Sequence, residues 1–172
     1  MNIQEYQARG LLKKHGVPIQ PFRFFTNLWD SFIHRDMITL LLARYEGKFI
    51  AGIIVLWFER TAYYKFGASD DVFQHTRANQ LLMWEAIRRA QARGCTLFDF
   101  GRTSVANKGL CLYKRRWGTV ERSLHTIRLP EGKKHGTLDE TSKRHVMLKR
   151  VMTRMPSWVF RLSGELFYRH LA

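Results

Sequence analysis

The sequence predicts an α+β domain built on one mixed, mostly antiparallel sheet that is flanked by helices. Two apolar, β-branched runs within residues 37–58 flank a hairpin turn signal at residues 46–48, and a third run covers residues 61–67. Helical periodicity extends over residues 77–94, and a strand-like run at residues 96–100 follows directly. A helix between two strands brings the chain back to the same sheet, so a mixed sheet is expected.

Two amphipathic segments are expected to precede the sheet. Residues 2–15 place apolar side chains near one side of a helix, which Gly16 and Pro18 end. Residues 21–33 repeat the pattern with an aromatic stripe, which is typical of core packing. The stripe consists of Phe22, Phe25, Leu28, Trp29 and Phe32.

Three antiparallel strands and one long helix form the centre of the predicted fold. Glu59 and Arg60 mark the second turn, and residues 69–76 read as a polar loop that leads into the helix. Gly94 fits as the cap of that helix, where nearby arginines oppose the negative end of its dipole. The expected buried face of the helix consists of Leu81, Leu82, Trp84, Ala86, Ile87 and Ala90.

The remaining segments divide the chain into a domain and an extension. Residues 119–129 read as a further strand, and residues 142–170 as two basic amphipathic helices broken at Pro156. We predict a domain over residues 1–130, of which 1–34 form leading helices, and a basic helical extension over 131–172 packed on it. The extension also has the composition of a helix that lies on an anionic bilayer, although a domain cover is the preferred interpretation.

Charge is the strongest global signal. The 172 residues contain 29 Lys and Arg against 14 Asp and Glu, a formal net charge of +15. Such an excess points to nucleic acid, anionic lipid or phosphate-bearing substrates. The chain has no bilayer-length apolar run and no signal-peptide core, so a cytoplasmic protein is expected. Cys95 and Cys111 are expected to be reduced core residues, and no His, Cys or carboxylate cluster has the spacing of a metal site.

One stretch, FDFGRTSVANKGLCLYKRRWGT at residues 98–119, combines chemistry that neither a core nor a solvated surface requires. The cations at 114–116 lie between Tyr113 and Trp117, soon after a predicted strand end. In one interpretation the rings pack inward and the three cations are simply solvated. In the other, the cations contact an anion and the rings stack on a base. The residues alone leave both interpretations open.

Three segments occur in an order that resembles the second GNAT-like domain of the Fem family of peptidyltransferases. They are YYKFGASDD, RANQLLMWEAIRRAQARGCTLFDFGRT and NKGLCLYKRRWG, and the resemblance covers roughly residues 3–129. It implies the GNAT N-acyltransferase fold, whose sheet splays open between neighbouring strands so that donor and acceptor meet. Members of known activity transfer an amino acid from aminoacyl-tRNA to a side-chain amine in the stem peptide of a peptidoglycan precursor.

The resemblance therefore implies an acyl- or aminoacyltransferase domain that acts on a cell-envelope precursor, in the cytoplasm or at the inner face of the membrane. The donor is a cosubstrate, aminoacyl-tRNA or an acyl carrier such as acyl-CoA, and no resident cofactor is implied. Fem proteins resemble a tandem of two such domains, and this sequence matches only the second. A separate first domain or a second copy of the chain is therefore an expected partner.

Residue by residue, the resemblance matches Tyr113-Lys114 with an aromatic–lysine pair whose lysine lies at the transfer site. The Lys114 ammonium is expected to stabilise the negative charge that forms on the carbonyl oxygen. It suits equally well the holding of a phosphate or a terminal carboxylate as a point charge. Tyr113, Arg115, Arg116 and Trp117 are expected to bind the donor.

Residues outside the basic stretch complete the expected site. Asp99 is placed at a strand end to act as base or, in the preferred interpretation, to hold the loop by pairing with Arg102. Gly101 permits a turn or a close approach of the backbone. Three polar residues, Lys65, Arg77 and Asn79, lie around the loop that enters the long helix, where a phosphate could bind. That loop contains no glycine, which disfavours acetyl-CoA as the donor.

Two other functions stay open at this point. A non-catalytic basic module that binds RNA or an anionic membrane would share the charge but not depend on Lys114. An acyl-CoA-dependent N-acetyltransferase would share the fold and differ in its donor.

Overall fold

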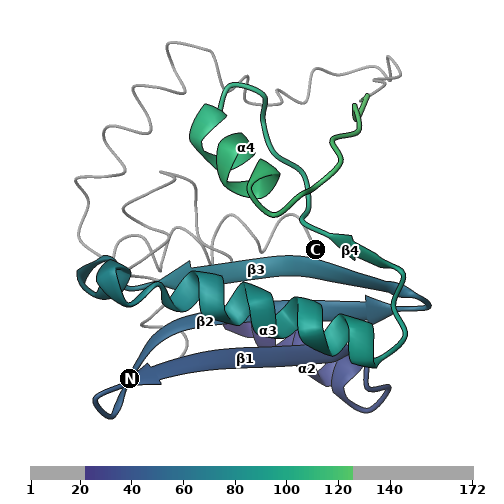
Figure 1. Ribbon diagram of the computed structural model, residues 1–172. Helices are drawn as coiled ribbons and strands as arrows, with labels where there is room; N and C mark the ends of the chain where they lie inside the picture. Colours follow the sequence, from purple (N-terminus) through teal and green to yellow (C-terminus); the bar gives the residue numbers. More distant parts are fainter. Residues whose placement is uncertain (1–21, 126–172) are drawn as a thin grey trace, which may run out of the picture. The chain divides into compact units, whose positions relative to one another are not determined.

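A computed structural model describes residues 22–125 (Figure 1). This part of the chain divides into two compact units, residues 22–99 and residues 100–125. The elements in chain order are α2 (Phe22–Ile33), β1 (Ile38–Tyr45), β2 (Lys48–Phe58), β3 (Thr61–Ser69), the 3-10 helix η1 (Asp71–Thr76), α3 (Ala78–Ala92), β4 (Leu97–Asp99) and α4 (Lys108–Arg115).

The first unit is a four-stranded sheet with the order β1-β2-β3-β4. The first three strands are antiparallel, and β4 runs parallel to β3 after the chain returns through α3. The predicted mixed sheet is therefore confirmed. The turn between β1 and β2 has positive φ at Glu46 and Gly47 (47° and 76°), the conformation that suits tight hairpins. Glu59, in the second turn, also has positive φ.

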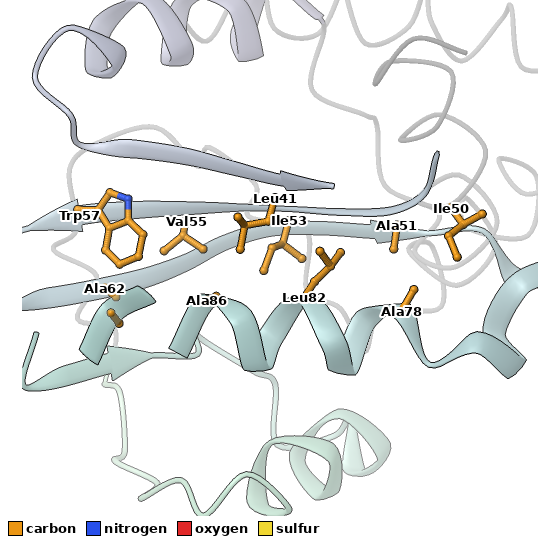
Figure 2. Packing of buried hydrophobic residues seen from close by; sticks show 11 residues of the cluster. Leu41, Ile50, Ala51, Ile53, Val55, Trp57, Ala62, Ala78, Leu82 and Ala86 are labelled. Carbon is orange, nitrogen blue, oxygen red and sulfur yellow. The ribbon is translucent and has the colours of Figure 1, made fainter. Parts of the chain in front are cut away.

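Each face of the sheet buries its own apolar cluster. On one face, α3 packs against β2, with Val55 fully buried between them (Figure 2). On the other face, Phe25 of α2 packs against Ile38 and Ile54. Because successive residues of a strand point to opposite faces, the neighbours Ile54 and Val55 belong to different clusters. Four residues of the predicted aromatic stripe, Phe25, Leu28, Trp29 and Phe32, are confirmed as part of the cluster that contains Ile54.

The end of α3 is held in place by one arginine. Arg93 lies 4.7 Å from the centroid of the Trp57 ring, and its Nη2 donates to the Asp36 carboxylate (2.6 Å) and carbonyl (2.7 Å). The Trp57 indole in turn donates to the Thr39 hydroxyl at 2.8 Å. Gly94 follows with a φ of 72°, as predicted for the cap. These contacts tie the end of α3 to the turn before β1.

Two residues of the expected buried face of α3 lie in solvent. Leu81 is 63% exposed and Trp84 is 59% exposed, so their assignment to the core is wrong. The buried face instead consists of Ala78, Leu82, Met83, Ala86 and Ala90. Four of these residues recur at a spacing of four along one side of the helix, with Met83 next to Leu82, and Leu81 and Trp84 lie on the other side.

Two smaller predictions also differ from the structure. Residues 71–76 form a 3-10 helix rather than a plain loop, because Asp70 caps it by accepting a hydrogen bond from the Val72 N–H. Residues 119–125 form no strand, and the rest of that predicted strand lies outside the described residues. The cysteines have free thiols and are half-buried rather than fully enclosed; Cys95 packs against the core.

Several predictions fall on residues 1–21 and 126–172, outside the described part of the chain. They are the helix at 2–15 and the two basic helices at 142–170. The boundary between a domain at 1–130 and an extension at 131–172 also stays a prediction.

Candidate active site

The second unit is organised around the short helix α4. The Asn107 side chain caps its start by accepting a hydrogen bond from the Leu110 N–H at 3.2 Å. At its end, Gly118 has a φ of 72° and donates its N–H to the carbonyl of Arg115 at 2.9 Å. Both ends are therefore fixed by the local sequence, and the last turn holds Lys114 and Arg115 in defined positions.

The Lys114 ammonium is fixed within the second unit. Its Nζ donates to the Phe100 carbonyl at 2.6 Å and to the Gly101 carbonyl at 2.7 Å. Gly101 has a φ of 71°, a conformation that side-chain-bearing residues rarely adopt, so a glycine is required at this turn. The interpretation in which all three cations are simply solvated is therefore wrong for Lys114, whose charge is held against the turn at residues 100–101.

Two aromatic residues lie beside this lysine on the chain and contact each other. The ring centroids of Tyr113 and Trp117 are 6.4 Å apart in an edge-to-face arrangement, and those of Phe100 and Trp117 are 6.3 Å apart. Burial raises the pKa of the Tyr113 phenol above its usual 10.0, while a hydrogen bond with the Trp117 side chain lowers it in part. Tyr113 is therefore a neutral phenol at physiological pH. Stacking of a base on these rings stays a prediction.

The two arginines after Lys114 have different environments. The Arg115 guanidinium makes a two-point ion pair with Glu121, with Nε to Oε1 at 2.5 Å and Nη2 to Oε2 at 3.1 Å. This hydrogen bonding raises the pKa of Arg115 and lowers that of Glu121 below its usual 4.5. Arg116 is exposed, as is Arg102 in the loop that leads to α4. Arg116 is thus the better placed of the two neighbours to meet an external anion.

Glu121 and Phe100 were missed by the sequence reasoning. Glu121 is the one carboxylate within residues 100–125, and it follows Arg115 just beyond the turn at Gly118. A lone carboxylate so close to three consecutive cations could have indicated an ion pair. Phe100 contributes a backbone carbonyl to Lys114 and a ring to Trp117. A carbonyl contact leaves no signature in residue identity, so no sequence pattern could have indicated it.

Asp99 belongs to the first unit, as the last residue of β4. It pairs with Tyr63 across the parallel ladder and is exposed, while the preceding Phe98 packs against the core. The carboxylate is therefore not in the buried environment that would suit a general base, and its role as base or loop anchor stays a prediction.

The edge of β3 beyond β4 is irregular. Residues 61–63 pair with β4, and β3 then continues to Ser69 with no further residue of β4 opposite it. Lys65 is an extra residue in the register with β2, since Ile54 pairs with Phe66 and Val55 with Tyr64. This bulge bends the strand where the ladder to β4 ends, which agrees with a sheet that opens at this point.

The entry to α3 combines Asn79 and Arg77. The Asn79 amide donates to the Ser69 hydroxyl at 2.7 Å and so ties the first turn of the helix to the end of β3. Arg77 is exposed, has a φ of 56° and caps the helix without a side-chain hydrogen bond. The structure thus gives Asn79 a structural partner and leaves the Arg77 guanidinium in solvent.

The predicted site residues thus fall into two groups. Lys65, Arg77, Asn79 and Asp99 belong to the unit of residues 22–99, whereas Gly101, Arg102, Tyr113, Lys114, Arg115, Arg116 and Trp117 belong to the unit of residues 100–125. Within residues 22–125 no group of three His, Cys, Asp or Glu side chains is arranged to hold a metal ion.

The sequence matches one protein-family model and is similar to a group of glycyltransferases. A family model described as an acetyltransferase (GNAT) domain matches residues 2–115. The lipid II:glycine glycyltransferase of Staphylococcus saprophyticus is 28% identical over 90 residues, which cover 49% of this chain and 22% of the relative. That of Staphylococcus aureus is 28% identical over 93 residues, which cover 51% and 22%. The chain thus spans about a fifth of the length of these relatives.

Solved structures agree on the fold. The aminoglycoside acetyltransferase AAC(6')-Iy, in complex with a CoA bisubstrate analogue, has a TM-score of 0.56 at 14% identity, covering 76% of this chain and 95% of that one. An aminoglycoside acetyltransferase from an uncultured soil metagenomic sample, meta-AAC0020 in complex with sisomicin, gives 0.54 at 15% identity, with coverage of 75% and 86%. The predicted α+β N-acyltransferase fold and the predicted resemblance are both confirmed.

Proposed function

The chain belongs to the family of acetyltransferase (GNAT) domains, and from this premise we propose that it forms an amide bond on an amine of a peptidoglycan-type precursor. The family makes the chain an acyltransferase. The choice of a cell-envelope acceptor is supported by the similarity to lipid II:glycine glycyltransferases. The observation that carries the proposal is the ammonium of Lys114, which two backbone carbonyls fix in place.

A fixed ammonium suits the chemistry of acyl transfer. The acceptor amine, after losing a proton, attacks the carbonyl carbon of the donor ester. A C–N bond forms, and negative charge develops on the carbonyl oxygen. The C–O bond to the donor then breaks, and the released hydroxyl takes up a proton. Lys114 stabilises the charge on the carbonyl oxygen, because an ammonium held in position needs no reorganisation as that charge develops.

The neighbouring residues have supporting roles in this proposal. Trp117 and Tyr113 bind the donor through their rings, and Arg116 contacts its phosphates. Arg115 holds the segment after α4 in place through its ion pair with Glu121. It also contributes positive charge to donor binding, together with Lys114 and Arg116. Asp99 orients or deprotonates the attacking amine. Lys65, Arg77 and Asn79 bind the donor from the unit of residues 22–99, with Arg77 contacting a phosphate.

Aminoacyl-tRNA is the proposed donor. The relatives whose sequences match about half of this chain are named as glycyltransferases. In addition, the loop that enters α3 contains no glycine, which disfavours a backbone cradle for the phosphates of acetyl-CoA. An acyl-CoA is the second candidate, because the first N–H groups of α3 have no side-chain cap and are suited to a phosphate group. We further propose that a separate first domain or a second copy of the chain completes the unit.

Within residues 22–125 the longest helix is too short and too polar to cross a membrane. We propose a cytoplasmic enzyme that works at the inner face of the membrane, where a lipid-linked acceptor is located.

A binding experiment tests the donor. The full chain is titrated with an aminoacylated tRNA acceptor stem, the same stem without its amino acid, and acetyl-CoA, over a range of salt concentrations. Lys114→Ala is compared with Lys108→Ala, which removes an exposed cation from the first turn of the same helix. Preference for the aminoacylated stem that only Lys114→Ala abolishes supports the proposal.

The other outcomes are equally distinct. Preference for acetyl-CoA indicates an acyl-CoA-dependent N-acetyltransferase. RNA binding that ignores the amino acid, falls only with salt and responds alike to both substitutions indicates a basic RNA-binding module and contradicts the proposal.

A further inference from the structure

The outer face of α3 carries an apolar pair between two arginines. Leu81 and Trp84 are both largely exposed, and Arg77 and Arg88 precede and follow them. The spacing of three and four residues places Leu81, Trp84 and Arg88 on one side of α3, and Arg77, the left-handed cap of this helix, directly precedes its first turn. The opposite side of α3, with Leu82 and Ala86, packs against the sheet (Figure 2). We refer to Arg77, Leu81, Trp84 and Arg88 as the outer α3 face.

Within the described residues 22–125, the side chains of Leu81 and Trp84 lie outside the packed core. The core of residues 22–99 is complete without Leu81 and Trp84, and neither belongs to either apolar cluster. An exposed tryptophan one turn from an exposed leucine is an unusual pairing on a domain surface, where apolar residues are normally scattered singly. Their adjacency points to a surface that is covered in the working protein.

The charges on this face favour an anionic partner. Glu85 is the one carboxylate on α3, and it accepts hydrogen bonds from both Arg88 and Arg89. These contacts lower the pKa of Glu85 to about 2, so the carboxylate is ionised and committed to the arginines. Arg77 has no ion-pair partner within residues 22–125. The face therefore presents net positive charge around its apolar centre.

This combination fits a lipid headgroup layer. Tryptophan favours the membrane interface, where its ring is apolar and its N–H is wet, and a leucine beside it enters the acyl boundary. Arginines at the edge of an apolar surface contact anionic headgroups. A second copy of the chain fits less well, since two such faces would bring like charges together.

We infer that the outer α3 face docks this domain onto an anionic membrane surface. The inference extends the proposed function, because an acceptor that is lipid-linked lies at that surface. The docking itself requires neither donor nor acceptor, so it is tested separately from transfer.

The test measures partition of the full chain into sedimented vesicles. One set of vesicles contains phosphatidylglycerol and phosphatidylcholine, and the other contains phosphatidylcholine alone. We expect the wild type to bind the anionic set, and Trp84→Ala and Leu81→Ala each to weaken that binding about tenfold, since burial of a large apolar side chain contributes roughly that factor. Phe58→Ala is the matched control, because Phe58 is an aromatic of similar exposure (54%) that lies at the end of β2, and it should leave partition unchanged.

A second measurement is independent of affinity. Brominated lipids quench a tryptophan that enters the bilayer, so quenching should fall in Trp84→Phe while this variant still sediments with anionic vesicles. Far-ultraviolet circular dichroism is expected to be unchanged in every variant, because the substituted side chains are exposed.

Several results would overturn the inference. They are failure of the wild type to bind anionic vesicles, binding that Trp84→Ala and Leu81→Ala leave intact, or loss of tRNA acceptor-stem binding in these variants while vesicle binding persists. A concentration-dependent dimer that Trp84→Ala abolishes would assign the face to a second copy instead. Vesicle binding that depends on Trp84 in a protein without transfer activity would support the docking face while contradicting the proposed function.

Discussion

Residues 22–99 are held together by two apolar clusters on opposite faces of a sheet, whereas residues 100–125 are held by a few polar contacts and the ring contacts of Trp117. The second unit depends on an asparagine cap, one lysine bound to backbone carbonyls and one ion pair. Apolar burial is distributed over many side chains, while each polar contact depends on a single residue. Substitutions should therefore lower global stability in the first unit and alter local order and chemistry in the second.

The largest expected loss of stability lies in the core of the first unit. Leu82→Ala removes a side chain that is 4% exposed, and it should lower the free energy of unfolding by about 3 kcal/mol. Its neighbour on the outer face is the control: Leu81→Ala should change stability by less than about 0.5 kcal/mol. Urea denaturation measures both. Equal losses would contradict the assignment of the buried and outer faces of α3.

A smaller effect is expected at the turn that holds Lys114. Gly101→Ala places a side chain on a residue with a φ of 71°, which costs roughly 1–2 kcal/mol. The cost should appear as faster hydrogen exchange in α4, with little change in the exchange of the sheet.

The matched control for that substitution lies within α4. Gly109→Ala is expected to slow exchange there, because a Cβ at Gly109 meets nothing closer than 4.0 Å and alanine favours a helix by roughly 0.5–1 kcal/mol. Faster exchange in the Gly109 variant, or none in the Gly101 variant, would contradict this account of the second unit.

The contacts of Arg93 with Trp57 and Asp36 should contribute less to the stability of the first unit than its apolar core does. Arg93→Ala removes the contact with the Trp57 ring and the ion pair with Asp36, and it should destabilise the protein by about 1 kcal/mol. Denaturation in a salt series separates the two terms, since salt screens the ion pair and leaves the ring contact largely intact. A loss of stability as large as that of Leu82→Ala would show that the contacts of Arg93, rather than apolar burial, contribute most to the stability of this unit.

The smallest expected effect is a dependence on pH at α3. Because Arg88 and Arg89 hold the pKa of Glu85 at about 2, below its usual 4.5, its contribution to stability is fully present above about pH 4.5. That contribution is lost as the pH falls towards 2. The difference in stability between the wild type and Glu85→Gln should therefore shrink over this range. A difference that stays constant down to pH 2 would contradict the ion-paired state of Glu85.

The same contrast explains what the sequence could predict. Strands β1 to β4, both hairpin turns and α2 follow from periodicity and turn chemistry, which act over a few neighbouring residues, whereas the strand predicted from residue 119 does not form over 119–125. Leu81 and Trp84 are apolar, so the sequence predicts them to be buried, although they lie in solvent. When a helix has apolar residues on both sides, periodicity does not show which side packs against the sheet. Packing against β2 settles that question, and it involves residues distant in sequence.

The candidate site was predictable in its residues but not in its contacts. Tyr113 and Lys114 were identified through a resemblance, and the cap at Gly118 agrees with ordinary helix-ending signals. The bond from Lys114 to the Phe100 carbonyl could not be anticipated, because every residue has a carbonyl. Arg115 is ion-paired with Glu121, whereas Arg116 is exposed. Composition alone does not distinguish these two arginines.

The role of Lys114 in transfer is tested by the single-turnover rate of transfer from an aminoacylated acceptor stem to an amine acceptor. Wild type, Lys114→Ala and Lys108→Ala are compared at equal saturation with donor. If the fixed ammonium stabilises the charge on the carbonyl oxygen, Lys114→Ala should lower the rate about 10²–10³-fold while Lys108→Ala leaves it near that of the wild type. If both variants transfer at the wild-type rate, or both lose the same modest factor, Lys114 is one cation among several and the central claim is wrong.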